Sequence, residues 1–230
     1  MPNAPHPPAV LEALREFDSA TISNAIEHFE VRDPVVGYAD LRLRCQFPEY
    51  RPMVGYAVTC TADTTSPGES RTSRFGELLE VVRNAPQPAV VVVQHVGTDR
   101  LKSCYFGDMS VSGLHRLGAV GVVTDGGNRD GAGIVRRAPG FQIFSPGWVV
   151  SHGRSAFLDL QVNVSVCGLN IAPGDLLHGD ANGLLVVPDG IADRLAAEAQ
   201  KVREQESEYF EFIESDEFSF EEWKRRIASH

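Results

Sequence analysis

The chain has 230 residues, of which 43% are hydrophobic and 23% are charged. These values exclude a globally disordered or fibrous chain, and the length suits one large domain or two small ones. The 31 acidic residues outnumber the 21 basic ones and leave a formal charge of −10, which argues against a nucleic-acid-binding surface. A few local arginines could still bind a small anionic substrate.

The sequence shows no sign of export or membrane insertion. No apolar run approaches the ~20 residues that span a bilayer, and the first ten residues are proline-rich, unlike a signal peptide. The four cysteines are scattered without a Cys-x-x-Cys pair, which favours a reducing compartment and argues against a zinc site. We therefore expect a cytoplasmic protein.

Taken in chain order, the first half predicts one capped helix, a second helix and two strands. Asp18 and Ser19 precede apolar residues at helical spacing, which is typical of an N-capped helix. Residues 54–61 follow a proline and alternate weakly, which favours a strand, whereas residues 75–83 form an amphipathic helical pattern. The apolar, β-branched run at 89–94 is typical of a strand buried on both faces.

The second half continues this alternation. Residues 107–117 are predicted to form a loop and a helix closed by Gly118, and residues 119–124 a second buried strand. Further short strands are expected between turn residues at 141–144, 162–166 and 184–187. His152 and His178 are expected in loops, and no histidine has metal-ligand spacing to another. The pattern predicts a mixed α/β fold with short crossovers.

The composition changes after residue 190. A long charged helix with one apolar stripe is expected from residue 191 onward, and a second short helix near the end of the chain. Ser219 with Glu222 forms a capping box, and Phe218 with Trp223 fits the hydrophobic staple around it. Aromatic side chains on so acidic a tail predict packing against the core or against a neighbouring subunit.

One segment combines features of an anion-binding site. Asp108 stands where a helix N-cap is expected, so the amides after it would point outward with the positive end of the helix dipole. The strand at 119–124 leads into a glycine-rich turn and then the pair Arg129–Asp130, and ligands of open α/β sheets gather at such strand ends. The arginine could bind a carboxylate and the aspartate a divalent cation. The alternative is an ordinary turn followed by a solvated Arg-Asp pair.

Gly107-Asp108, the strand at 118–124 and Asp125-Gly126-Gly127-Asn128-Arg129-Asp130 resemble the signature of the RraA-like family. This family includes class II 4-hydroxy-4-methyl-2-oxoglutarate/4-carboxy-4-hydroxy-2-oxoadipate aldolases and the regulator of ribonuclease activity A. The resemblance extends through most of the chain, with further matching segments at 20–25, 55–59 and 173–188. Asn24 and Asn128 depart from the family pattern, which commonly has aspartate and an apolar residue at these positions.

The resemblance implies a role for each matching residue. Arg129 would bind a substrate carboxylate and stabilise the pyruvate enolate, Asp130 would ligate Mg²⁺ or Mn²⁺, and Asp108 would hold a metal-bound or catalytic water. The backbone around Gly107, Met109 and Ser110 would bind the substrate carboxylate. A glutamate of the C-terminal helix would reach the site of a neighbouring subunit, with Glu204 as the best match and Glu206 as the alternative.

The resemblance also implies an architecture and an assembly. It predicts an α/β sandwich related to swivelling phosphohistidine-type domains over residues 1–188, followed by a C-terminal helical extension over 189–230. The extension would pack on the core or on a neighbouring subunit. The assembly would be a homotrimer or a homohexamer with its sites between subunits.

The scarcity of lysine favours metal chemistry over a Schiff base. Cleaving a carbon–carbon bond beside a 2-oxo acid leaves an enolate, whose charge either a lysine Schiff base or a metal ion can accept. Of the three lysines, Lys201 and Lys224 lie in the C-terminal helical region. Lys102 lies in a predicted connector, where the desolvation that tunes a Schiff-base lysine is not expected.

We therefore expect a metal-dependent aldolase that releases pyruvate from a 4-hydroxy-2-oxo diacid, with oxaloacetate decarboxylation as a side reaction through the same enolate. Two alternatives remain open. One is a non-catalytic protein-binding regulator like the ribonuclease-inhibiting relatives, whose acidic charge would suit basic partners. The other is a lyase of the same scaffold with a different oxo-acid substrate. The C-terminal extension favours the aldolase, because the regulators are shorter.

Overall fold

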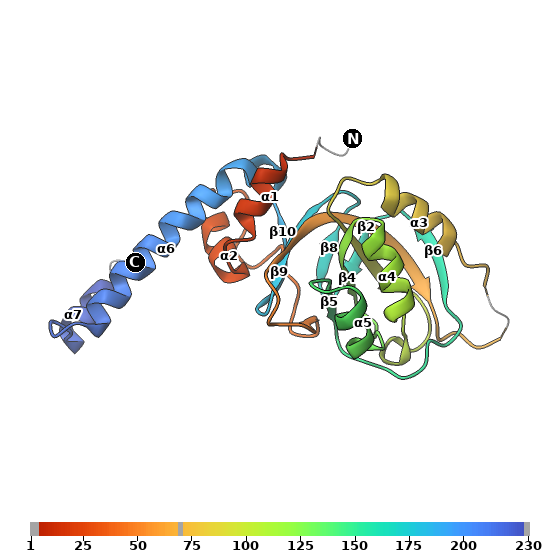
Figure 1. Cartoon of the computed structure of the whole chain (residues 1–230). Helices are drawn as coiled ribbons and strands as arrows, with labels where there is room; N and C mark the ends of the chain where they lie inside the picture. Colours follow the sequence, from red (N-terminus) through yellow and green to blue (C-terminus); the bar gives the residue numbers. More distant parts are fainter. Residues whose placement is uncertain (1–4, 69–70, 228–230) are drawn as a thin grey trace.

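The computed structural model describes residues 5–68 and 71–227 (Figure 1), so the first four residues of the proline-rich start lie outside it. Within the described residues, an eight-stranded mixed sheet has the order β1-β5-β4-β3-β2-β9-β10, with β6 also paired to β2. Strands β2 to β5 pair in parallel, and the other pairings are antiparallel. The strands are β1 (Arg44–Cys45), β2 (Met53–Asp63), β3 (Ala89–His95), β4 (Ala119–Thr124), β5 (Gln142–Ser145), β6 (Ala156–Leu160), β9 (Leu176–Asp180) and β10 (Gly183–Val187). The predicted mixed α/β class is confirmed, whereas the relation to swivelling phosphohistidine-type domains stays a prediction.

Burial on both faces explains why the central strands could be predicted. Successive side chains of a strand point to opposite faces of the sheet, and along β3 Val91 and Val93 enter one core cluster while Val90 and Val92 enter another. The first cluster lies under the helices, and the second lies under the antiparallel hairpin β7 (Val164–Val166) and β8 (Leu169–Ile171). Because both faces of β3 are buried, no position along it favours a polar residue, and its sequence is therefore almost continuously apolar.

The helices fall into two groups (Figure 1). Helices α3 (Phe75–Asn84), α4 (Asp108–Arg116) and α5 (Gly131–Arg137) cover one face of the sheet. Helices α1 (Pro8–Leu14), α2 (Ser19–Glu27) and the first half of α6 (Ala192–Glu214) form a third core cluster with β9 and β10. The carboxylate of Asp18 accepts hydrogen bonds from the amides of Ala20 and Thr21, which confirms the predicted cap of α2.

Several elements differ from the sequence prediction. Helices α1 and α5 and strands β1, β6 and β8 were not predicted. His178 lies fully buried in β9, where Ser19 Oγ is 3.0 Å from its Nδ1 and the Leu14 carbonyl is 3.1 Å from its Nε2. The prediction of a loop position was therefore wrong, because these two distant partners satisfy both ring nitrogens and allow the polar ring to be buried.

The C-terminal half of α6 and helix α7 (Phe220–Ile227) extend from the core as an arm (Figure 1). Val202 is the last residue of α6 in the α1–α2 cluster, and beyond it the arm packs on itself. The rings of Phe212 and Phe218 are 5.8 Å apart, and Trp223 Nε1 donates a hydrogen bond to the Tyr209 hydroxyl at 2.6 Å. Four of the arm's aromatic residues, Tyr209, Phe212, Phe218 and Trp223, therefore contact one another within the chain, and a contact with a neighbouring subunit stays a prediction.

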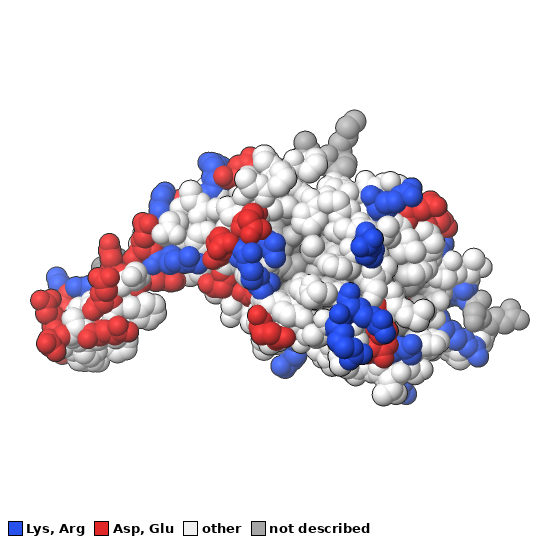
Figure 2. Space-filling model, viewed as in Figure 1, with Lys and Arg blue, Asp and Glu red and all other residues white. Residues whose placement is uncertain are grey.

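One of the two bonds of the predicted capping box at the start of α7 is present, whereas the Glu222 carboxylate pairs with Arg225 and Arg226. The Glu222 amide donates to Ser219 Oγ at 3.3 Å, and the rings of Phe218 and Trp223 are 6.0 Å apart. The arm is strongly acidic (Figure 2), since every charged residue from 204 to 222 is Asp or Glu. No helix in the described part of the chain has both the length and the apolar composition that crossing a membrane requires.

Candidate functional site

The candidate site is assembled by the loop 125–130, which follows β4 at the carboxyl end of the parallel strands. Isolated β-bridges join this loop to a segment on each side: Gly127 pairs with Cys104, and Asn128 pairs with Trp148. The Arg129 amide donates to the Phe106 carbonyl at 2.9 Å. Because these backbone contacts hold the loop against residues 104–107, Arg129 and Asp130 lie beside the start of α4.

Arg129 and Asp130 form an ion pair in which the guanidinium Nε is 3.2 Å from the carboxylate Oδ2. Asp130 has a φ of 61°, a left-handed conformation that aspartate tolerates better than most residues. A Cβ atom on Gly107 would lie 2.6 Å from Asp130 Oδ2, so only glycine at 107 allows this approach. The predicted contact between the Gly-Asp and Arg-Asp segments is therefore present in the structure.

Helix α4 begins one residue earlier than predicted, because Asp108 was expected to be its N-cap. Gly107 is its N-cap residue, and Asp108 is its first helical residue. The Gly107 amide donates to Ser110 Oγ at 3.1 Å, whereas the amides of Asp108, Met109 and Ser110 donate to no acceptor within the described chain. The Met109 side chain is 87% exposed, so its part in the site comes from its backbone. Free amides at a helix N-terminus form an anion-binding site.

Arg137, which no sequence motif indicated, joins the site from the last turn of α5. Its Nε lies 3.1 Å from Asp108 Oδ2. Helix α5 can approach α4 closely because residue 133 is glycine. A Cβ atom at this position would lie only 2.6 Å from the same carboxylate oxygen. Arg137 and Asp108 are 29 residues apart, and no local pattern connects them, so only the paired glycines of α5 hinted at a close approach here.

The buried polar groups behind the loop hold it in place. Asp125 accepts a hydrogen bond from the His95 amide at 2.8 Å and lies 3.4 Å from Arg100 Nη1, and its burial raises the pKa of its carboxyl. The His95 ring is hydrogen-bonded to the Tyr105 hydroxyl, and burial lowers the pKa of the imidazole. His95 is thus a satisfied buried histidine that links the ends of β3 and β4 to the segment leading into Gly107.

Cys104 is the thiol nearest to the charged pair, and it is buried. Burial raises the pKa of this thiol to about 11, against a smaller lowering by Arg129. Since the thiolate is the nucleophilic form of cysteine, Cys104 is not a nucleophile at neutral pH.

The residues present fit a hydrated magnesium or manganese ion better than zinc. The described residues contain no group of three or more His, Cys, Asp or Glu side chains placed to hold a metal, and a zinc site needs at least three protein ligands. Mg²⁺ often takes only one or two carboxylates and keeps several waters. The exposed Asp130 carboxylate has only Oδ2 in its ion pair, which leaves Oδ1 available.

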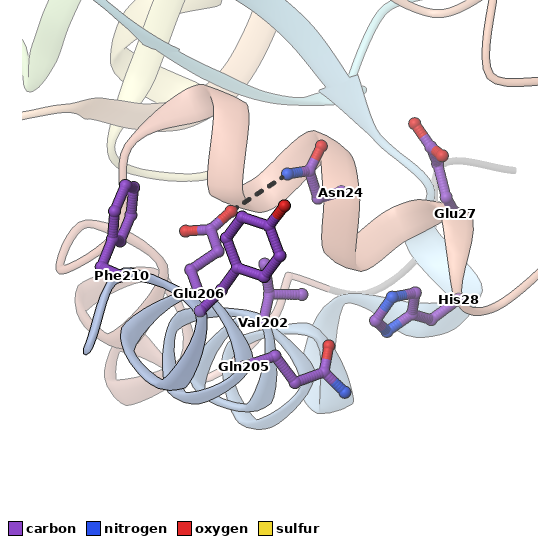
Figure 3. A pocket seen from close by; sticks show the side chains of 8 residues that line it. Asn24, Glu27, His28, Val202, Gln205, Glu206 and Phe210 are labelled. Atoms are coloured by element: carbon purple, nitrogen blue, oxygen red, sulfur yellow. Dashed lines mark hydrogen bonds between the residues drawn. The ribbon is translucent and has the colours of Figure 1, made fainter. Parts of the chain in front are cut away.

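The two C-terminal glutamates lie away from this site within the chain. Glu204 Oε1 accepts a hydrogen bond from Gln200 on α6 at 2.9 Å. Glu206 lines a cavity between α2 and α6 and lies 3.5 Å from Asn24 Nδ2 (Figure 3), whereas α4 and α5 cover the sheet elsewhere (Figure 1). A role for either glutamate in a neighbouring subunit's site stays a prediction.

Lys102 lies in an exposed connector, as predicted. It ends the short 3-10 helix η1 (Arg100–Lys102), where its Nζ is exposed and lies 3.3 Å from Asp99.

The chain matches a known family over most of its length. The model of the RraA-like family (Aldolase/RraA) matches residues 19–186. A putative 4-hydroxy-4-methyl-2-oxoglutarate aldolase of Halalkalibacterium halodurans is 34% identical over 98 residues, which are 41% of this chain and 45% of that protein. An uncharacterized protein of Methanocaldococcus jannaschii is 27% identical over 140 residues, 60% of this chain and 66% of that protein. The chain thus spans less than two thirds of the length of each of these relatives.

Among solved structures, RraAS2 of Streptomyces coelicolor, an unusual member of the RNase ES inhibitor RraA protein family, is similar with a TM-score of 0.67. The two are 25% identical, and the similarity covers 89% of this chain and 98% of the other. Both charged segments of the candidate site fall inside the matched residues 19–186. The chain therefore belongs to the RraA-like family.

Proposed function

We propose that this protein is a divalent-metal-dependent lyase that releases pyruvate from a 4-hydroxy-2-oxo diacid, with oxaloacetate decarboxylation as a side reaction. The observation that carries the proposal is the meeting of Arg129 and Asp130 with the unused amides of the first turn of α4. The family name Aldolase/RraA and the putative aldolase among the relatives support it.

In this mechanism the chain's own residues bind the 2-oxo acid and stabilise developing charge. The amides of Met109 and Ser110 donate to the substrate carboxylate, and the Nη groups of Arg129 face the oxygen on which negative charge grows as the bond breaks. Asp130 would hold the divalent cation, which would supply further positive charge for the enolate. The water that Asp108 Oδ1 holds takes the proton of the 4-hydroxyl group as the carbon–carbon bond breaks, and returns it to the methylene carbon of the enolate to give pyruvate.

The test separates the roles of Arg129 and Asp130. Arg129→Lys keeps the charge but loses the planar fork, so turnover in a pyruvate-release assay should fall about 10²–10³-fold while Mn²⁺ binding persists. Asp130→Gly removes the carboxylate without straining the left-handed backbone, so it should abolish Mn²⁺ binding measured by calorimetry.

Near-normal turnover of Arg129→Lys, or normal Mn²⁺ binding by Asp130→Gly, would contradict the proposal. Arg83→Lys, on the exposed end of α3, is the matched control for the first change. EDTA should remove wild-type activity, and Mg²⁺ or Mn²⁺ should restore it.

We also propose a homotrimer or homohexamer in which sites lie between subunits. Large apolar side chains close to the site are exposed in the single chain, among them Met109, Trp148 and Val150, and exposed apolar patches mark interaction surfaces. Sedimentation velocity tests this, and a monomer at micromolar concentration would contradict it.

A second candidate function is regulation through a basic protein partner. It is favoured by the arm, whose charged residues from 204 to 222 are all acidic. If the arm serves regulation alone, replacing four of these acidic residues by lysine should abolish binding of a basic protein partner. The same variant should still release pyruvate at the wild-type rate.

A further inference from the structure

We propose that Arg137 is a second anion-binding arginine of this site, which selects 2-oxo acids that carry a further carboxylate. The inference rests on the proposed function and adds a specificity-determining residue to it. Both arginines lie beside the first turn of α4, Arg129 paired with Asp130 next to Gly107 and Arg137 paired with Asp108.

The two guanidinium groups are held in the same way. Each has its Nε beside an aspartate oxygen, in an ion pair at 3.2 Å for Arg129 and in a hydrogen bond at 3.1 Å for Arg137. No other hydrogen bond or ion pair within the described residues engages either guanidinium. An arginine has five N–H donors in a rigid plane, so the Nη groups of both stay available to an anion while the ion pairs with Asp130 and Asp108 keep the arginines in place.

The surroundings of Arg137 suit a ligand contact. Its side chain is 60% exposed, so an incoming anion reaches it directly. The Asp108 carboxylate that holds it is only partly exposed and is fixed against the backbone of Gly133. A guanidinium anchored by such an ion pair loses less side-chain entropy on binding than a free surface arginine.

The site therefore offers two separate anion-binding positions. The first consists of the α4 amides and Arg129, and the second of the Nη edge of Arg137. Because Asp108 and Asp130 balance the two arginines in charge, recognition depends on directed N–H donors rather than on a net positive field. A ligand with one carboxylate occupies the first position alone, and a ligand with two occupies both.

The test uses a matched pair of ligands that differ only at the second carboxylate. In 2-oxoglutarate the chain ends in a carboxylate, and in 2-oxopentanoate it ends in a methyl group. Binding is measured by calorimetry and by the fluorescence of Trp148, whose ring packs against Gly131 beside Asp130, in a Trp223→Phe background. Both measurements are made with and without Mg²⁺ and need no turnover.

Wild-type protein should bind 2-oxoglutarate more tightly than 2-oxopentanoate. Arg137→Gln should weaken 2-oxoglutarate about tenfold, the cost typical of one charge-assisted hydrogen bond at an exposed site, and should change 2-oxopentanoate less than twofold. Arg137→Lys should keep part of the preference. Arg136→Gln, the same charge change at the exposed neighbouring position of α5, should leave both ligands unchanged.

Equal weakening of both ligands by Arg137→Gln would show that Arg137 acts only by holding Asp108, and would overturn the inference. Unchanged affinities, no preference in the wild type, or no binding of either ligand would overturn it too. If wild-type protein selects 2-oxoglutarate through Arg137 but releases pyruvate from no 4-hydroxy-2-oxo diacid, the proposed reaction fails and the role of Arg137 stands. If the protein releases pyruvate but shows no preference for 2-oxoglutarate, the proposed reaction stands and the role of Arg137 fails.

Discussion

Replacing Asn128 by leucine should stabilise the protein. The Asn128 side chain is 0% exposed, and neither its Oδ1 nor its Nδ2 has a hydrogen-bond partner among the described residues. Its backbone is satisfied independently, because its amide donates to the Gly147 carbonyl at 3.2 Å and its carbonyl accepts from the Val149 amide at 2.9 Å. Leucine has nearly the shape of asparagine, so Asn128→Leu removes the two unpaired polar atoms without disturbing these contacts.

The size of the effect follows from the cost of burying an unpaired amide. An unsatisfied buried polar group costs about 1–3 kcal/mol, and leucine adds favourable apolar burial in place of that cost. Imperfect fit of the branched side chain would offset part of the gain, so we expect the free energy of unfolding to rise by about 1–2 kcal/mol. For a chain of this length each kcal/mol raises Tm by roughly 2–4 °C.

Thermal unfolding followed by circular dichroism measures the change, with urea unfolding as a check on the free energy. Asn170→Leu, at an exposed position of β8, is the matched control and should shift the free energy by less than about 0.5 kcal/mol. A loss of stability in Asn128→Leu with an unchanged control would refute the reasoning, because it would mean that the amide has a partner in solution. A gain in stability accompanied by loss of turnover would show that the amide serves the neighbouring Arg129.

Two further predictions concern the α1–α2–α6 side of the molecule. Burial lowers the pKa of His178, so the folded state binds fewer protons than the unfolded state, and stability should fall as pH drops below the unfolded pKa of about 6.5. In urea unfolding between pH 7.5 and 5.5, His178→Gln should reduce the slope of the free energy of unfolding against pH by up to about 1.4 kcal/mol per pH unit. His152→Gln, at an exposed position, should leave that slope unchanged. A chain ending at Glu206 keeps Val202, the last α6 residue in the core cluster, so it should fold. In sedimentation it should form an assembly of fewer subunits than the full chain does. An unchanged oligomer would show that the arm plays no part in assembly.

The sequence by itself determined the elements whose signals are local. The strands β3 and β4 were predicted within one residue of their bounds, because strands buried on both faces must be continuously apolar. The cap of α2 and the start of α7 were predicted because a capping side chain bonds to amides two or three residues away. The meeting of Gly107 with Arg129–Asp130 was expected from the family resemblance and is present in the structure.

Only the tertiary structure decided the features that depend on residues far apart in the chain. Helix α5 contains two glycines, whose low helix propensity argues against a helix, yet the approach of Asp108 to Gly133 requires the absence of a side chain there. Arg137 became part of the site through this packing, 29 residues from its partner. His178 is buried in β9 because Leu14 and Ser19 satisfy both of its ring nitrogens. Local propensity cannot contain such information, since the free energy that settles each of these features comes from groups that the fold alone brings into contact.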